Sequence, residues 1–201
     1  LLSRAVEFLP DDAALTERTR RGQALTRPEL AVLLAYAKLT LDEDLLATGV
    51  PDDPYLARRL SLYFPREILD KFPAAVELHR LRREIIATSL VNAVINRGGP
   101  ACIVRLTDET DADISTIVMA QVAVDAIYEL RRLNDAIDAL DTRIDGQLQL
   151  SLYAAIQDLL LSRMVWYVRN VDFKDGLNAI IARFGPAVRK VAAALDDALP
   201  P

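Results

Sequence analysis

Residues 25–39, LTRPELAVLLAYAKL, constrain the fold more than any other stretch of this chain. Thr26 and Glu29 have the Ser/Thr-x-x-Glu spacing of a capping box, and Pro28 falls in the first helical turn, where a proline is well tolerated. The segment then continues apolar on every side, whereas a helix at a protein surface normally keeps a polar face. We therefore expect a helix over this segment, enclosed on all sides by other structure.

Helix-start and helix-stop signals recur along the rest of the chain, and strand signals are nearly missing. Proline-marked starts predict three helices in the first half, over residues 53–63, 65–71 and 73–96. Gly98, Gly99 and Pro100 are expected to stop the third of these helices. Residues 101–106, ACIVRL, are the only plausible extended segment, and they are too short and isolated to build a sheet.

The second half predicts a pair of long helices. Over residues 112–141 the apolar positions alternate in steps of four and three, as in a coiled-coil seam: Met119, Ala123, Ala126, Leu130, Leu133, Ile137 and Leu140, with Ile144 just beyond. A second helix after Gly146 carries a similar seam, and the short connection favours an antiparallel helical hairpin. Asp172 is expected to cap a further helix that breaks at Gly185-Pro186, before a final alanine-rich helix.

These signals predict an all-α protein, a multi-helix bundle of about eight helices with a long antiparallel hairpin in its second half. We place a boundary near residue 100, between an N-terminal helical subdomain (1–100) and a C-terminal one (101–201). The chain starts Leu-Leu-Ser-Arg, without Met, and its first ten residues are typical of the end of an earlier element. We therefore expect it to be a fragment of a larger polypeptide.

Charge and cysteine usage exclude several classes of function. The formal net charge is −5 and the isoelectric point is near 5.0, whereas nucleic-acid binders usually carry a basic excess. The single cysteine, Cys102, cannot form an internal disulfide, which fits a reducing cytoplasm. Charge-free runs fall short of the ~18–20 residues that a membrane helix needs. We expect a cytoplasmic protein with no nucleic-acid or membrane partner.

Motifs that carry chemistry are sparse. The seven glycines include no G-x-G pair, so we expect no dinucleotide-binding loop. His79 lacks a spaced His or Cys partner for zinc, and Cys102 has no nearby His to activate its thiol. The acidic run 108–113 lacks the glycine and closing glutamate of a calcium loop and suits the positive end of a helix. We predict no catalytic residue, cofactor-binding residue or metal ligand in this chain.

The densest basic cluster is HRLRREI, residues 79–85. Arg80, Arg82 and Arg83, together with Asn92, are candidate contacts for docking another domain or an anion. The alternative is a solvated helix face, in which Arg80 pairs with Glu84 one turn on. Asn92 lies among apolar residues, where a buried amide needs a partner, so we expect it to bridge to a neighbouring helix.

Six segments in this order resemble one family: RAVEFLP (4–10), LTRPELAVLLAYAKL (25–39), PDDP (51–54), YFP (63–65), HRLRREIIAT (79–88) and the Asn96-Arg97-x-Gly99 turn. The chain is similar to the C-terminal region of the large bacterial NAD-specific glutamate dehydrogenases, over about residues 4–170. Ala101 and Cys102 stand where the family pattern leads us to expect Thr-Phe, and Asn134 stands where we expect Trp. We interpret all three as packing positions.

The resemblance implies that the glutamate-binding and NAD-binding domains lie upstream of this region in the parent enzyme. That enzyme would convert glutamate and NAD to 2-oxoglutarate, ammonium and NADH, while this chain would hold no cofactor itself. We expect a non-catalytic helical module that packs on the upstream catalytic domain or a neighbouring subunit of a homo-oligomer, in assembly or regulation. Two alternatives stay open: a regulatory domain that binds a small effector between helices, and an independent helical enzyme or adaptor.

Overall fold

The structure, a computed structural model, describes residues 6–7 and 9–198, so Arg4, Ala5 and Phe8 of the first family segment lie outside the described residues. Within that part the chain forms eleven α-helices and three short 3-10 helices, and no strand. The all-α prediction is confirmed, with more helices than the eight expected. In chain order they are α1 (Asp12–Arg20), α2 (Arg27–Leu46), η1 (Val50–Asp52), η2 (Pro54–Ala57), α3 (Arg58–Tyr63), α4 (Arg66–Lys71), α5 (Pro73–Glu77), α6 (Arg82–Gly98), α7 (Cys102–Thr110), α8 (Ile114–Ile127), α9 (Leu130–Asp138), α10 (Gly146–Asn170), η3 (Phe173–Asp175) and α11 (Gly176–Ala198).

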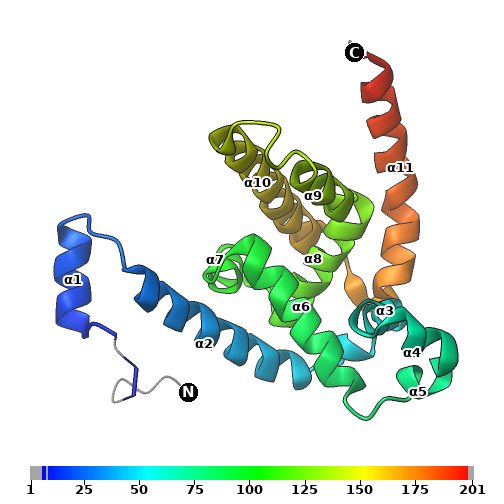
Figure 1. Ribbon diagram of the computed structural model, residues 1–201, viewed down its shortest axis with the longest axis horizontal. Coiled ribbons are helices and arrows are strands. Elements are labelled where there is room, and N and C mark those ends of the chain that lie inside the picture. The colour runs from blue at the N-terminus through cyan, green and yellow to red at the C-terminus, as the bar shows by residue number, and fades with distance from the viewer. Residues whose placement is uncertain (1–5, 8, 199–201) are drawn as a thin grey trace.

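Helix α2 begins at the capping box that the sequence predicts. The Thr26 backbone N–H donates to Glu29 Oε2 at 2.7 Å, and Arg18 of α1 donates to the same oxygen at 2.8 Å. The predicted enclosure of this helix is wrong within this chain, because Leu30 is 46% exposed and Leu39 is 54% exposed. Leu41 and Leu45 in the last turns of α2 are buried in the core, and Leu34 and Ala37 pack against it while only partly buried. The first turns of α2 project away from the other helices together with α1 (Figure 1).

Two predicted long helices are each broken into two. A turn at residues 78–81 separates α5 from α6, and there the Leu81 N–H donates to His79 Nδ1 at 3.2 Å. A second turn separates α8 from α9, where Glu129 has a left-handed φ of 51°. The apolar spacing continues across this second turn, so the pattern predicted one helix where the backbone forms two.

Two further predictions are corrected in the opposite direction. Residues 101–106 are not extended, because Ala101 caps α7 and residues 102–106 form its first turns, where Cys102 and Leu106 lie one turn apart and both enter the core. Gly185-Pro186 does not end the last helix, which runs unbroken from Gly176 to Ala198. Proline removes one backbone donor from α11, and the packing of α11 on α8 holds the helix together across it.

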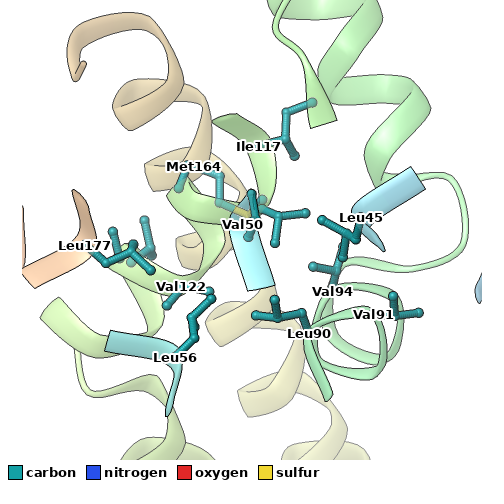
Figure 2. Packing of buried hydrophobic residues seen from close by; sticks show 14 of the residues in the cluster. Leu45, Val50, Leu56, Leu90, Val91, Val94, Ile117, Val122, Met164 and Leu177 are labelled. Atoms are coloured by element: carbon teal, nitrogen blue, oxygen red, sulfur yellow. The ribbon is translucent and has the colours of Figure 1, made fainter. Parts of the chain in front are cut away.

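The core gathers around α8, which packs against α10, α11, α7 and α6. Figure 2 shows Ile117 and Val122 of this helix in a cluster with residues from distant segments: Leu45, Val50, Leu56, Leu90, Val91, Val94, Met164 and Leu177. These residues come from both sides of residue 100, and the division into two subdomains stays a prediction. No helix in the described part is both long and apolar enough to cross a membrane.

Helix α10 forms the second arm of the predicted hairpin. It packs along both α8 and α9, so the first arm is bent at Glu129 while the second is continuous (Figure 1). Near the closed end, Gln149 Nε2 donates to the Ile137 carbonyl at 3.1 Å, and the Tyr153 hydroxyl donates to Asp138. The bend places Glu129 and the start of α9 at the wall of a pocket.

Candidate functional site

A cavity of about 690 Å³ opens between α3, α6, α8 and α9. This volume lies in the range of sites for small molecules. Its described walls carry five arginines and three carboxylates: Arg58, Arg59, Arg97, Arg131, Arg132, Asp125, Glu129 and Asp135. We call it the arginine pocket. None of its described lining residues is His, Cys, Lys or Ser, and its titratable side chains are the arginines, the three carboxylates and Tyr55.

Two Arg-Arg pairs, each placed at the start of a helix, supply most of the positive charge. Arg58 and Arg59 open α3, and the other pair, 131–132, lies in the first turn of α9. A core leucine adjoins each pair: Leu60, which is 2% exposed, follows the first pair, and Leu130, which is 1% exposed, precedes the second. Burial of the leucine fixes the backbone of the turn, and the adjacent guanidinium groups are thereby held at the pocket wall.

The deep wall of the pocket holds charges that are poorly solvated. Arg59 Nη1 donates to Ser89 Oγ at 2.9 Å, and burial lowers the pKa of Arg59 while the charge of Asp125 raises it. Burial likewise raises the pKa of Asp125, against the opposing charges of Arg97 and Arg59. Both side chains of this wall therefore bear a desolvation cost in their charged forms.

The contact between Arg97 and Asp125 only partly offsets that cost. Arg97 Nη1 and Asp125 Oδ1 are 3.9 Å apart, which is beyond hydrogen-bond distance. Neither atom has a hydrogen-bond partner among the described residues, although both atoms are buried. A buried polar atom without a partner is a costly feature that a bound group could relieve.

The rim of the pocket is more exposed. The Arg58 guanidinium lies over the Tyr55 ring, 4.1 Å from its centroid, which is a cation–π contact. Arg132 Nε pairs with Glu129 Oε2 at 2.9 Å. Arg58 and Arg131 form no ion pair within the described residues. The rim thus keeps guanidinium donors that no carboxylate of the described residues occupies.

The basic cluster singled out in the sequence has a different place. Arg83 clamps the end of α2, because its Nη2 donates to the carbonyls of Leu46 and Thr48, each at 2.9 Å, and its Nη1 pairs with Asp52. Arg80 lies in the turn before α6. Arg80 therefore forms no helical pair with Glu84 in the described structure. The alternative of a solvated helix face with an Arg80–Glu84 ion pair is wrong on this point.

Asn92 bridges two helices as expected. Lys38 Nζ of α2 donates to Asn92 Oδ1 of α6 at 2.8 Å. None of Arg80, Arg82, Arg83 and Asn92 lines the arginine pocket. Their role in docking a domain or an anion stays a prediction, while the structure already gives intramolecular partners to Arg83 and Asn92.

The remaining sequence features have structural roles in the described part. Cys102 is buried, and burial raises the pKa of its thiol; a Cβ added at Gly98 would lie 2.5 Å from Cys102 Sγ. Asn134 Nδ2 donates to the Leu130 carbonyl at 2.7 Å. Asp113, from the acidic run, caps α8 by accepting from the Thr116 N–H at 2.7 Å. No group of three or more His, Cys, Asp or Glu side chains among the described residues could hold a metal ion.

The sequence reasoning missed the arginine pocket. Its signal was present as two Arg-Arg-Leu runs, 58–60 and 131–133, at the starts of two helices. Such runs are common on exposed helices, and only the tertiary structure brings these two to one cavity with Arg97.

Comparisons with known proteins give a consistent answer. A family model described as glutamate dehydrogenase, C-terminal, matches residues 22–201. The NAD-specific glutamate dehydrogenase of Pseudomonas aeruginosa is 35% identical over 198 residues, 98% of this chain and 12% of that protein. The protein of the same name from Halomonas elongata is 38% identical over 168 residues, 84% of this chain and 10% of that protein. That from Mycobacterium tuberculosis is 37% identical over 127 residues, 63% of this chain and 8% of that protein. The chain spans about a tenth of the length of these relatives.

Proposed function

The chain belongs to the glutamate dehydrogenase C-terminal family, and on that premise we propose that it is a non-catalytic module of a large NAD-specific glutamate dehydrogenase that acts in assembly or regulation. The upstream part of such an enzyme would bind glutamate and NAD and transfer the hydride. A helical fold without alternating strands supports this division, since the described residues offer no sheet edge of the kind that binds a dinucleotide.

The observation that carries the proposal is the exposure of apolar side chains on opposite sides of α2. Leu30 and Leu39 are about half exposed, although the first half of this helix lacks a continuous polar face. The surface of α3 to α5 and the turn after them adds further large exposed apolar side chains: Leu62, Tyr63, Ile68, Phe72, Leu78 and Leu81. Exposed apolar surface of this extent is typical of a region that another protein surface covers.

The catalytic part of the proposal is tested by assaying the purified 201-residue chain with NAD and glutamate. We expect no NADH formation at concentrations of chain at which the full-length enzyme turns over readily. Measurable turnover that co-purifies with the chain would contradict a non-catalytic role.

The assembly part is tested in the full-length enzyme with Leu30→Glu/Leu39→Glu on α2. We expect loss of the native oligomer in light scattering, because a charge at each position opposes burial against a partner. Val191→Glu/Leu195→Glu on α11 makes the same chemical change at residues of similar exposure and serves as the matched control. An unchanged oligomer in the α2 variant would contradict docking through this helix.

A second candidate function is a regulatory domain that binds a small effector, and the arginine pocket favours it. The pocket is of ligand size, is built from four helices and leaves Arg58 and Arg131 without an ion pair among the residues that the structure describes. Stabilisation of the chain by a ligand in a thermal-shift screen of amino acids and nucleotides would support this function, and uniform silence would count against it.

A further inference from the structure

We propose that the arginine pocket binds a small anion that carries two or more carboxylate or phosphate groups. Its biological meaning rests on the regulatory form of the proposed function, whereas binding itself is measured on this chain alone. The pocket shares no residue with the basic cluster that the sequence singled out.

The balance of charge selects an anion. Five guanidinium groups face three carboxylates, which leaves an excess of two positive charges in one cavity. The chain as a whole carries a net charge of −5, so the positive potential is local to this pocket. A long polyanion such as a nucleic acid would be repelled by the rest of the surface, while a small anion would meet only the pocket.

The arrangement of donors selects an anion with more than one charged group. Arg58 of α3 and Arg131 of α9 line the cavity from different helices, and neither has an ion pair within the described residues. A guanidinium presents a rigid fork that matches a carboxylate or a phosphate with two hydrogen bonds. Two such forks on separate helices are best satisfied by a ligand that presents an anionic group to each.

The deep wall supplies a third contact. Arg97 Nη1 is buried without a hydrogen-bond acceptor among the described residues, and Arg59 is largely shielded from water. An anionic oxygen that reaches this wall would accept from Arg97 and offset the desolvation of Arg59. Electrostatic contacts are stronger at such a site than at the exposed rim, because the surrounding medium is less polar.

The three carboxylates of the pocket differ in how strongly they oppose a bound anion. Glu129 is engaged by Arg132, and Asp125 lies beside Arg97, but Asp135 has no ion pair within the described residues. Its negative charge opposes an anion bound nearby. Neutralising Asp135 should therefore strengthen binding, an effect that damage to the fold would not produce.

The test is isothermal titration of the 201-residue chain at constant ionic strength with acetate, succinate, tricarballylate, phosphate and pyrophosphate. We expect one site per chain, no saturable binding of acetate, and affinity that rises with the number of anionic groups. Tighter binding of pyrophosphate than of tricarballylate would assign a phosphate ligand, and the reverse order a carboxylate ligand. Absence of saturable binding for both of these probes would overturn the proposal.

Variants locate the binding. Arg58→Gln/Arg131→Gln should weaken the tightest probe by about a hundredfold or more, since it removes two charge-assisted contacts and each is worth at least about tenfold in affinity. Arg66→Gln removes the same charge from α4, where the side chain is 90% exposed and outside the pocket, and should bind normally. Asp135→Asn should bind more tightly than the unmodified chain. Equal weakening by Arg66→Gln, or weaker binding by Asp135→Asn, would contradict a specific site.

These outcomes are separable from those of the proposed function. Leu30→Glu/Leu39→Glu lies outside the pocket and should keep the affinity for the probes. If neither probe binds saturably while Leu30→Glu/Leu39→Glu disrupts the oligomer as expected, the pocket proposal alone is contradicted. Turnover by the chain, or an unchanged oligomer, with successful titration would contradict the proposed module alone.

Discussion

Helices α2 and α8 are both rich in aliphatic side chains, but they have very different surroundings. In α8 eight of fourteen residues are buried, and six other helices contact it: α2, α6, α7, α9, α10 and α11. In α2 three of twenty residues are buried, and its contacts fall mainly on α6. The interior of the molecule is built on α8, whereas α2 extends from that interior (Figure 1). Leu30 and Leu39 of α2 are both about half exposed.

The difference shows that an apolar helix sequence predicts burial, but it does not tell which surface buries the helix. For α8 the chain provides that cover itself, through α10 and α11. For α2 it does so fully only at Leu41 and Leu45 near the C-terminal end, while Leu34 and Ala37 are partly covered. The family relatives are much longer than this chain, which is consistent with a partner surface for α2 in the rest of such a polypeptide.

The largest expected effect on stability comes from a substitution that opens a cavity beside α8. Ile117→Ala should lower the free energy of unfolding by about 2–5 kcal/mol, because Ile117 is fully buried and the neighbours cannot close the space. Leu39→Ala in α2 should change it by no more than about 0.5 kcal/mol in the isolated chain. Urea unfolding followed by circular dichroism measures both. Equal losses would show that α2 is enclosed after all.

Local signals in the sequence predicted much of the helical layout. The Thr26–Glu29 capping box, the Asp53-Pro54 start and the glycines after α6 act through atoms a few residues apart, so their effect is readable from sequence. The breaks at residues 78–81 and at Glu129 have no such signal. They are set by how flanking segments pack, and the apolar spacing continues through them.

The candidate site was less predictable for the same reason. Asn92 could be foreseen as a bridge, because an amide among apolar neighbours must find a partner. The arginine pocket could not, because α3, α6, α8 and α9 each supply only part of its wall. Arg97, the deepest of its unsatisfied donors, was noted only as part of a helix-ending turn.

A polar residue inside α8 gives the second test. Gln121 is 1% exposed, and neither side-chain amide atom has a hydrogen-bond partner among the described residues. Gln121→Met keeps the length of the side chain and removes both unpaired groups, so it should raise the free energy of unfolding by about 1–3 kcal/mol. Thermal and urea unfolding would show the gain. A loss of stability would mean that the amide is satisfied, and Gln121→Ala serves as the control for lost packing.

The polar link between α2 and α6 predicts a smaller effect. Lys38 and Asn92 are half-buried and joined by a single hydrogen bond, so a double-mutant cycle with Lys38→Met and Asn92→Leu should give a coupling of about 1 kcal/mol. A coupling near zero would show that α2 is held only by its last apolar turns. The same cycle with Lys38 and the more distant Asn96, which is exposed, is expected to give none.

The smallest effects distinguish the two helices by the sign of their pH dependence. Hydrogen bonds from the Thr26 backbone and Arg18 hold the pKa of Glu29 below its usual range, so Glu29 stabilises the fold above its ordinary pKa and loses this contribution as the pH falls through the lowered value. Burial raises the pKa of Asp125 in α8, so its ionised form costs stability at neutral pH, and the cost is relieved as the pH falls through the raised value towards the ordinary one.

Glu29→Gln should therefore be less stable than the unmodified chain at neutral pH, and Asp125→Asn should be at least as stable. Both differences should disappear on acidification, that for Asp125 at the higher pH, because its folded-state pKa is raised while that of Glu29 is lowered. Urea unfolding across the acid range measures this. If both variants lose stability at neutral pH, or both gain it, the contrast between Glu29 and Asp125 is contradicted. Glu29 is hydrogen-bonded at the start of α2, whereas Asp125 is poorly paired in the pocket.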